Sequence, residues 1–387
     1  MDSFDRDVWC LLGLPFDALT MSQAIEQVRA TAASRARCFV STPNLNFVVE
    51  AEADESFRDS VINSDLSLAD GMPLVWLARV LGVPIPERVA GSDLFETMRS
   101  QDTTDAMPGS AAQAFTVFFF GGPERAAERA CERLNADGGG LRCVGWHYPG
   151  FVGLDEMSRQ DIIAKINASG ADFLVVSLGA RKGQAWIVHN LPRLRVPVVS
   201  HLGAVVNFLA GSVSRAPPWM RKVGLEWLWR ILEEPALVRR YAGDGLALLR
   251  LILTRVLPYM LWRWSRRLFT KPAVHAHVSV PLPAADRLGA DSHSTHAADE
   301  GCRIVVSGAL LAEDLGPLRR AFRKAAASGL DVTVDLDGVV GVDGAFLGLL
   351  MMLRKEVNAG RRRLRIERAS GRIRRIFWLN AAAYLLK

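Results

Sequence analysis

Three polar clusters in the first hundred residues carry side chains that could do chemistry. They are Thr42-Pro43-Asn44-Leu45-Asn46, Ala69-Asp70-Gly71 and Glu87-Arg88-Val89-Ala90-Gly91-Ser92-Asp93. Each falls where a short strand is expected to end, and open α/β sheets bind ligands at the ends of their strands. One reactive carboxylate, one arginine and several small polar groups are therefore expected to converge on one crevice.

Asp70 is the candidate general base of this crevice. It would follow the strand Leu66–Leu68, Gly71 would allow the turn, and Pro73 suits the first turn of the next helix. A carboxylate close to a helix N-terminus tends to stay ionised, as a general base must. A turn or capping aspartate is the alternative.

Arg88 is the candidate cation. Its guanidinium group could bind a diphosphate through charge-assisted, bidentate hydrogen bonds, and the alternative is an exposed ion pair with Glu87. Ser92-Asp93 is interpreted as a helix N-cap. The lone histidines His147 and His201 are interpreted as structural, and no cluster has the spacing of a metal site.

Two glycine-containing turns follow later apolar runs. They are Phe120-Gly121-Gly122 and Ser177-Leu178-Gly179-Ala180-Arg181-Lys182-Gly183-Gln184. Glycines in such turns let backbone N–H groups approach a nucleotide phosphate or base. A tight turn that needs glycine, and a basic surface turn, are the respective alternatives.

The elements that must position these residues follow from the hydrophobic pattern. Apolar runs predict buried strands, with helical patterns between them, at Cys38–Ser41, Leu66–Leu68, Phe115–Phe120, Phe173–Leu178 and Val196–Ser200. Residues 1–210 are therefore expected to form an α/β domain with a Rossmann-like, mostly parallel sheet flanked by helices.

Residues 211–270 form a basic, aromatic segment. Twelve Lys or Arg and four Asp or Glu lie between Arg215 and Lys271, so this segment carries +8 while the whole chain carries +6. Five of the ten tryptophans lie there too. This composition predicts an appendage that contacts anionic lipid headgroups, and no nucleic acid partner is expected.

The stretch Gly245–Trp264 is apolar enough to suggest a membrane span, but Arg250 and Arg255 lie inside it and Pro258 interrupts it. Each charge near the centre of a membrane helix costs about 2.5–3.5 kcal/mol on insertion scales. The stretch is therefore predicted to lie on the membrane. A helix packed on its own domain or on a sister subunit is the alternative.

The five cysteines are scattered, without metal-type or paired spacing, which predicts free thiols and a reducing compartment. They are Cys10, Cys38, Cys131, Cys143 and Cys302. The N-terminus is acidic and lacks the apolar core of a secretory signal. The catalytic part is therefore expected in the cytoplasm.

Taken in order, these motifs resemble the WecG/TagA/CpsF glycosyltransferases from about residue 10 to 245. The resemblance also includes Gly203-Ala204-Val205-Val206-Asn207-Phe208, Arg215-Ala216-Pro217-Pro218-Trp219-Met220, Leu225-Glu226-Trp227-Leu228-Trp229-Arg230 and Glu234-Pro235. It implies inverting transfer, without a metal or other cofactor, of a sugar from a UDP-sugar to a polyprenyl-diphosphate-linked glycan. The donor sugar would be of the N-acetylmannosamine type, glucose or a uronic acid relative. The setting would be envelope or exopolysaccharide biosynthesis, with a peripheral protein on the cytoplasmic face of the inner membrane.

The resemblance also implies roles for individual residues. Asp70 would be the general base, Arg88 would lie beside the donor, and cations of the appendage would meet diphosphate. The substrate-binding set is Thr42, Asn44, Gly71, Gly121, Gly122, Gly179, Arg181, Gln184, Asn207, Arg230, Arg239 and Arg240. The family usually has Gly-x-Pro-Lys-Gln-Glu where this chain has Gly179 to Gln184, and an aspartate is common at Asn207. The donor sugar therefore stays open.

After an expected linker at 271–300, residues 301–387 resume an order of strand and helix. The expected elements are Arg303–Ser307, Leu315–Ala327, Asp331–Leu336, Gly344–Asn358, Leu364–Ile366 and Gly371–Leu379. The run from Val332 to Leu350 resembles a STAS domain. Regulatory members carry a phosphorylated hydroxyl two residues after Asp343, where this chain has Ala345. Docking to a protein partner or a second copy, or a structural role, remains, and Asp343 is expected to cap a helix.

A second function stays open beside the transferase. A decayed transferase domain could sense a nucleotide sugar without catalysis and signal through the STAS-like domain. The altered loop from Arg181 to Gln184 supports this alternative, whereas the retained Asp70 and Arg88 oppose it.

Overall fold

The computed structural model describes residues 2–101, 114–262, 277–279 and 301–387. Residues 17–248 form one compact unit, and residues 2–16 together with 249–387 form a second. The expected linker at 271–300 lies outside the described residues, apart from β9 (His277–Ser279).

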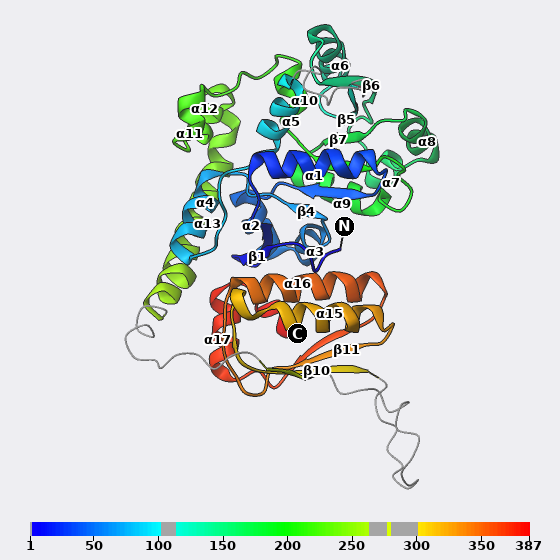
Figure 1. Cartoon of the computed structure of the whole chain (residues 1–387). Helices are drawn as coiled ribbons and strands as arrows, with labels where there is room; N and C mark the ends of the chain where they lie inside the picture. The colour runs from blue at the N-terminus through cyan, green and yellow to red at the C-terminus, as the bar shows by residue number, and fades with distance from the viewer. Residues whose placement is uncertain (1, 102–113, 263–276, 280–300) are drawn as a thin grey trace. The chain divides into compact units, whose positions relative to one another are not determined.

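A parallel six-stranded sheet forms the centre of the first unit (Figure 1). Its order is β4-β3-β8-β7-β5-β6. The strands are β3 (Cys38–Ser41), β4 (Leu66–Ser67), β5 (Phe115–Gly121), β6 (Leu141–His147), β7 (Phe173–Ser177) and β8 (Val198–His201). The predicted α/β fold with a parallel sheet is confirmed. The sequence did not predict β6, because Arg142 and Gly145 interrupt its apolar run at the edge of the sheet.

Helices cover both faces of this sheet. The core on one face includes residues of α1, α5, α6 and α10, and the core on the other includes residues of α8 and α9. The helices are α1 (Met21–Ala33), α2 (Leu45–Ala53), α3 (Glu55–Ile62), α4 (Met72–Leu81), α5 (Gly91–Ser100), α6 (Ala126–Asp137), α7 (Leu154–Met157), α8 (Gln160–Ala168), α9 (Ala180–Asn190) and α10 (Val205–Leu209). Because both faces are covered, central strands such as β5 and β7 are almost wholly apolar.

The basic segment forms further helices after the sheet. They are α11 (Pro218–Lys222), α12 (Glu226–Glu233) and α13 (Val238–Leu251). Helical residues continue from Pro235 to Trp262, and these 28 residues are long and apolar enough to cross a membrane by length and composition alone. Whether this helix lies on a membrane therefore stays a prediction.

Cys131 and Cys143 form a disulfide, so the expectation of free thiols is wrong for this pair. Helix α6 carries Cys131 beside β6, which carries Cys143, and the two Cα atoms lie 5.2 Å apart. Disulfides need Cα atoms at about this distance. The pair could not be predicted from the sequence, because the contact depends on β6. Cys10, Cys38 and Cys302 are free.

The second unit is a smaller α/β domain. Its strands have the order β12-β10-β11-β13, all parallel, with β9 antiparallel beside β10. The elements are β10 (Cys302–Leu310), α15 (Gly316–Ala327), β11 (Val332–Asp335), β12 (Val339–Val342), α16 (Gly344–Ala359), β13 (Leu364–Glu367) and α17 (Gly371–Leu379). Asp343 caps α16 as expected, since its side chain accepts a hydrogen bond from the Phe346 N–H at 3.0 Å. Ala345 is buried.

The N-terminal residues 2–16 belong to this second unit. Strands β1 (Val8–Leu11) and β2 (Leu14–Asp17) form a hairpin, and β1 packs on α16. Arg319 donates hydrogen bonds to the carbonyl oxygens of Phe4 and Arg6, both at 2.8 Å. The two ends of the chain thus build one domain together, which the sequence did not predict.

Candidate active site

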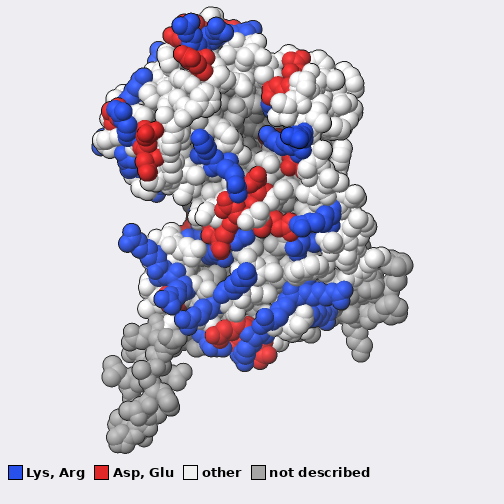
Figure 2. Space-filling view, turned by 180° about the vertical axis from the view of Figure 1, so that it is seen from behind, with Lys and Arg blue, Asp and Glu red and all other residues white. Residues whose placement is uncertain are grey.

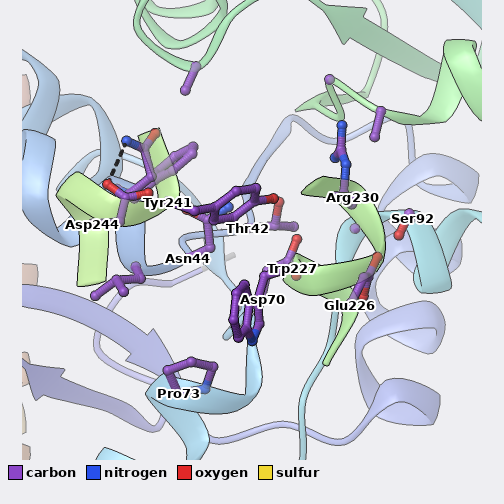
Figure 3. A pocket seen from close by; sticks show the side chains of 18 of the residues that line it. Thr42, Asn44, Asp70, Pro73, Ser92, Glu226, Trp227, Arg230, Tyr241 and Asp244 are labelled. Carbon is purple, nitrogen blue, oxygen red and sulfur yellow. Dashed lines mark hydrogen bonds between the residues drawn. The ribbon is translucent and has the colours of Figure 1, made fainter. Parts of the chain in front are cut away.

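A cavity of about 640 Å³ lies in the unit of residues 17–248. Its walls are residues that follow β3, β4, β7 and β8, together with residues of α12 and α13 (Figure 3). The chain winds from β3 to β4 on one side, whereas β8, the other neighbour of β3, follows from β7. Open α/β sheets bind ligands where the winding reverses in this way. The volume suits a small-molecule site.

Asp70 lies between β4 and α4 and faces this cavity. Its N–H donates to the Pro43 carbonyl at 2.9 Å, and the Val89 N–H donates to the Ala69 carbonyl at 2.9 Å. The three polar clusters of the sequence therefore meet. Gly71 caps α4 with φ +132°, a conformation that favours glycine, and the first turn of α4 contains the predicted proline.

Arg88 is surrounded by three carboxylates. Its guanidinium group pairs with Glu226 at 3.1 Å, approaches Asp70 at 3.9 Å and also binds Asp93. Glu87, the partner expected in the alternative interpretation, accepts a hydrogen bond from the Met21 N–H at 2.7 Å instead. The Arg88 side chain is only 13% exposed, and it lines the cavity.

Asp93 binds the basic segment to the helices around the six-stranded sheet. It was interpreted as part of a helix N-cap, but Ala90 takes the N-cap position of α5. The Asp93 carboxylate instead binds the guanidinium groups of Arg88, Arg215 and Arg221, the last at 2.7 Å. Two of these arginines come from the basic segment, more than 120 residues along the chain.

The environment of Asp70 shifts its ionisation. Burial raises the pKa of Asp70 to about 7, although Arg88 lowers it; the charges of Glu226 and Asp93 raise it further. Burial thus outweighs the helix N-terminus that was expected to keep this carboxylate ionised. The side chain is 27% exposed, so a substrate in the cavity can reach it. A carboxylate with a pKa near 7 is suited to general base catalysis at neutral pH.

The cavity brings together many of the predicted site residues. Its lining includes Thr42, Asn44, Asp70, Gly71, Arg88, Gly179, Arg230 and Arg240. Asn44 also caps α2, because its side chain accepts a hydrogen bond from the Phe47 N–H at 3.3 Å. The fold therefore unites segments that are up to 200 residues apart in the chain.

Other predicted residues do not line this cavity. They are Gly121, Gly122, Arg181, Gln184, Asn207 and Arg239. A Cβ on Gly121 would lie 2.8 Å from the Ser177 carbonyl oxygen, so this glycine allows β5 to end close to β7. Arg181 is exposed and pairs with Glu50 at 2.8 Å and with Asp54 at 3.0 Å.

Gln184 is buried, and Asn207 is half-buried. The Gln184 amide donates to the Ser41 hydroxyl at 3.2 Å. The amide oxygens of Gln184 and Asn207 are buried and have no hydrogen-bond partner among the described residues. A role for either residue in substrate binding stays a prediction.

The sequence analysis gave no role to several residues that line the cavity. They are Asn46, Arg221, Glu226, Trp227, Tyr241 and Asp244. Glu226 and Asp244 are two of the four acidic residues between Arg215 and Lys271. An acidic residue retained in a strongly basic segment is the signal that could have identified them.

Comparison with protein families identifies the two domains of this chain. Residues 9–260 match the model of the glycosyl transferase WecG/TagA/CpsF family. The chain belongs to this family. Residues 293–383 match a model described as Mlab, STAS domain. Both resemblances drawn from the residues are confirmed.

Two relatives show how far the similarity extends. An N-acetylglucosaminyldiphosphoundecaprenol N-acetyl-beta-D-mannosaminyltransferase of Bacillus spizizenii is 29% identical over 203 residues, which cover 52% of this chain and 74% of the relative. A protein of the same name from Staphylococcus aureus is 23% identical over 224 residues, which cover 57% of this chain and 83% of the relative. The chain is thus a glycosyltransferase of the WecG/TagA/CpsF family, and the cavity beside Asp70 is its candidate active site.

Proposed function

We propose that this glycosyltransferase moves a sugar from a UDP-sugar to a polyprenyl-diphosphate-linked glycan with inversion, and that Asp70 is the general base. The observation that carries the proposal is the Asp70 carboxylate, which faces the cavity beside Arg88 with a pKa raised to about 7. A base with this pKa is about half ionised at pH 7, and its ionised form can take a proton from a hydroxyl group during attack.

In the proposed reaction, Asp70 removes the proton of an acceptor hydroxyl while that oxygen attacks C1 of the donor sugar. The new C–O bond forms on the face opposite UDP. The bond between C1 and the phosphate oxygen breaks, and its electron pair leaves with UDP. A single displacement of this kind inverts the configuration at C1.

Guanidinium groups are the proposed partners of the departing diphosphate. Arg88, Arg221 and Arg230 line the cavity, and arginine binds phosphate oxygens in a bidentate manner. Fixed positive charge stabilises the negative charge that builds on the leaving group. In the described part of the chain, no group of three His, Cys, Asp or Glu side chains could hold a metal ion.

The names of the relatives support a lipid-linked acceptor. Both are named for transfer to N-acetylglucosaminyldiphosphoundecaprenol, which is a sugar linked to a polyprenyl diphosphate. We extend this acceptor class, and a role in envelope or exopolysaccharide biosynthesis, to the present chain. Membrane attachment on the cytoplasmic face suits such an acceptor, and the basic segment exposes Trp219 (61%) and Leu232 (68%) for it.

The test is the transfer of sugar by Asp70→Asn in the full chain. We expect the rate to fall at least about 100-fold, because the amide cannot accept the proton, while binding of the UDP-sugar is kept. Asp155→Asn, an exposed position on α7, is the matched control and should transfer normally. Transfer at the wild-type rate by Asp70→Asn would contradict the role of the base. Nucleotide binding by the wild type, with no turnover on any acceptor, would favour the sensor.

A further inference from the structure

The cavity has a second polar region whose residues take no part in the proposed reaction. Asp244 from α13 and Asn46 from α2 line it, next to Arg240 and Tyr241. Figure 3 shows Asp244 on one side of the cavity and Glu226 and Arg230 on the other. The two acidic residues of the appendage that line the cavity therefore lie in different surroundings.

The Asp244 carboxylate is buried and has few donors. The residue is 8% exposed. It receives one long hydrogen bond, from the Asn46 amide at 3.5 Å, and approaches the Arg240 guanidinium at 3.9 Å. An ionised carboxylate can accept about four hydrogen bonds, and buried polar groups are normally satisfied. A ligand in the cavity would supply the missing donors.

Charge decides what kind of ligand fits there. Burial raises the pKa of Asp244, the Asn46 hydrogen bond and Arg240 lower it, and the negative charge of Glu50 raises it again. A phosphate group placed against the Asp244 carboxylate would be repelled by it. A neutral group with several O–H or N–H donors would complete the hydrogen bonds of Asp244 without adding charge.

Neighbouring hydroxyl groups of a sugar ring have this chemistry. Two adjacent hydroxyls can donate to the two oxygens of one carboxylate, as the ribose of a dinucleotide does to an acidic residue in Rossmann folds. The Asn46 amide oxygen can accept from a third donor, and its amide N–H already orients Asp244.

We infer that Asp244 and Asn46 bind neighbouring hydroxyl groups of a sugar ring in one of the substrates. The inference rests on the proposed function for the identity of those substrates. The ribose of UDP, the donor sugar and the acceptor sugar all carry hydroxyls of this kind. In this arrangement Arg88, Arg221 and Arg230 bind the diphosphate on one side of the cavity, and Asp244 binds a sugar on the other.

The experiment compares the full chain with Asp244→Asn and Asn46→Ala. Titration calorimetry gives the Kd for UDP and for a panel of UDP-sugars, and steady-state kinetics gives KM for the lipid-linked acceptor. We expect one ligand to bind about tenfold to a hundredfold more weakly to Asp244→Asn, the usual effect of losing hydrogen bonds to a charged group. Asn46→Ala should weaken the binding of the same ligand. The exposed Asp155→Asn is the control that should bind as the wild type.

The ligand affected identifies the sugar. Weaker binding of UDP assigns the ribose, weaker binding of a UDP-sugar with UDP unchanged assigns the donor sugar, and a higher KM for the acceptor alone assigns the acceptor sugar. Thermal unfolding checks folding, and Asp244→Asn should be at least as stable as the wild type, because it removes a buried charge that has few donors.

Failure of this inference can be told apart from failure of the proposed function. If the wild type transfers sugar and both variants keep all three affinities, the inference is overturned and the function stands. If the wild type binds a UDP-sugar through Asp244 but transfers nothing, the function is overturned and the inference stands. A wild type that binds none of the three ligands overturns both.

Discussion

At Asp70, opposite charges act on one carboxylate. Burial raises its pKa to about 7, Arg88 lowers the pKa, and Glu226 raises it. Glu226 also binds Arg88 directly, at 3.1 Å. The ionisation of Asp70, the proposed general base, therefore depends first on burial and then on the charges of Arg88 and Glu226.

Replacing either neighbour should move the pKa of Asp70 in a known direction. Glu226→Gln removes a negative charge and should lower the pKa, whereas Arg88→Gln removes a positive charge and should raise it, each by about one unit. The rising limb of kcat/KM against pH reports these shifts. Midpoints that move in the same direction in both variants would contradict the proposed arrangement.

The raised pKa of Asp70 also predicts an effect on stability. Aspartate in the unfolded chain has a pKa of about 3.9, so between this value and about 7 the folded state binds more protons than the unfolded state. The protonated Asp70 side chain therefore stabilises the folded state fully below the pKa of the unfolded chain. This stabilisation is lost as the pH rises through the pKa of the folded state. At pH 8, Asp70→Asn should therefore be more stable than the wild type by at least about 1.4 kcal/mol, the worth of one pKa unit. Thermal unfolding should show a midpoint a few degrees higher, and equal midpoints would argue against the shift.

At the scale of elements, ion pairs of carboxylates join the basic segment (the appendage of residues 211–270) to the part of the unit that holds the six-stranded sheet. Asp93 of α5 binds Arg215 and Arg221, and Glu226 of α12 binds Arg88. Residues of α12 and α13 then complete the lining of the cavity. The site is therefore an assembly of strand ends and appendage helices.

Asp93→Asn tests this attachment. It leaves three arginines around a neutral group, and breaking a partly buried ionic cluster of this kind costs about 3 kcal/mol. We expect a lower midpoint of thermal unfolding and a kcat/KM reduced more than about tenfold. Asp161→Asn, which breaks an exposed pair with Arg159 outside the cavity, should lower both far less. Equal midpoints for the two variants would show that Asp93 does not hold the appendage.

The strands of the first unit that the sequence predicted share one property, which is burial on both faces of the sheet. Cys38–Ser41 and Phe115–Phe120 are mostly apolar, so their runs marked the strands. The polar clusters met because parallel neighbours end at one edge. The half-exposed strand β6 gave no such signal, and the disulfide was missed with it. Tyr241 and Asp244 could not be placed, because their position depends on how α13 packs against the strand ends.

For the whole molecule, the order of the chain differs from the order of its units. Residues 2–16 and 249–387 build one unit, so the chain enters residues 17–248 from that unit and returns to it. Asp17 lies at the first junction and accepts a hydrogen bond from the Ser67 N–H at 2.7 Å, three residues before Asp70.

Residues 301–387 hold sixteen Lys or Arg and eight Asp or Glu, and Figure 2 shows Lys and Arg gathered over this part.

Gly348→Ala tests the packing of the N-terminal hairpin on α16. In a free helix this change would stabilise by about 1 kcal/mol. Here the added Cβ would overlap the Val8 carbonyl group and lie 3.0 Å from the Trp9 Cα. We therefore expect lower stability and faster hydrogen exchange in residues 8–16. Gly371→Ala, where a Cβ meets nothing within 4 Å, is the control. Higher stability of Gly348→Ala with unchanged exchange would show that the hairpin is not docked.

The role of Asp70 as general base is tested most directly by kcat/KM for sugar transfer as a function of pH, in the full chain and in Asp70→Asn. A base acts when ionised, so we expect the wild-type value to rise with pH and to level off above about 7. Asp70→Asn should be at least about 100-fold slower and should lack this inflection. A variant that keeps the wild-type rate and the inflection would contradict Asp70 as the base.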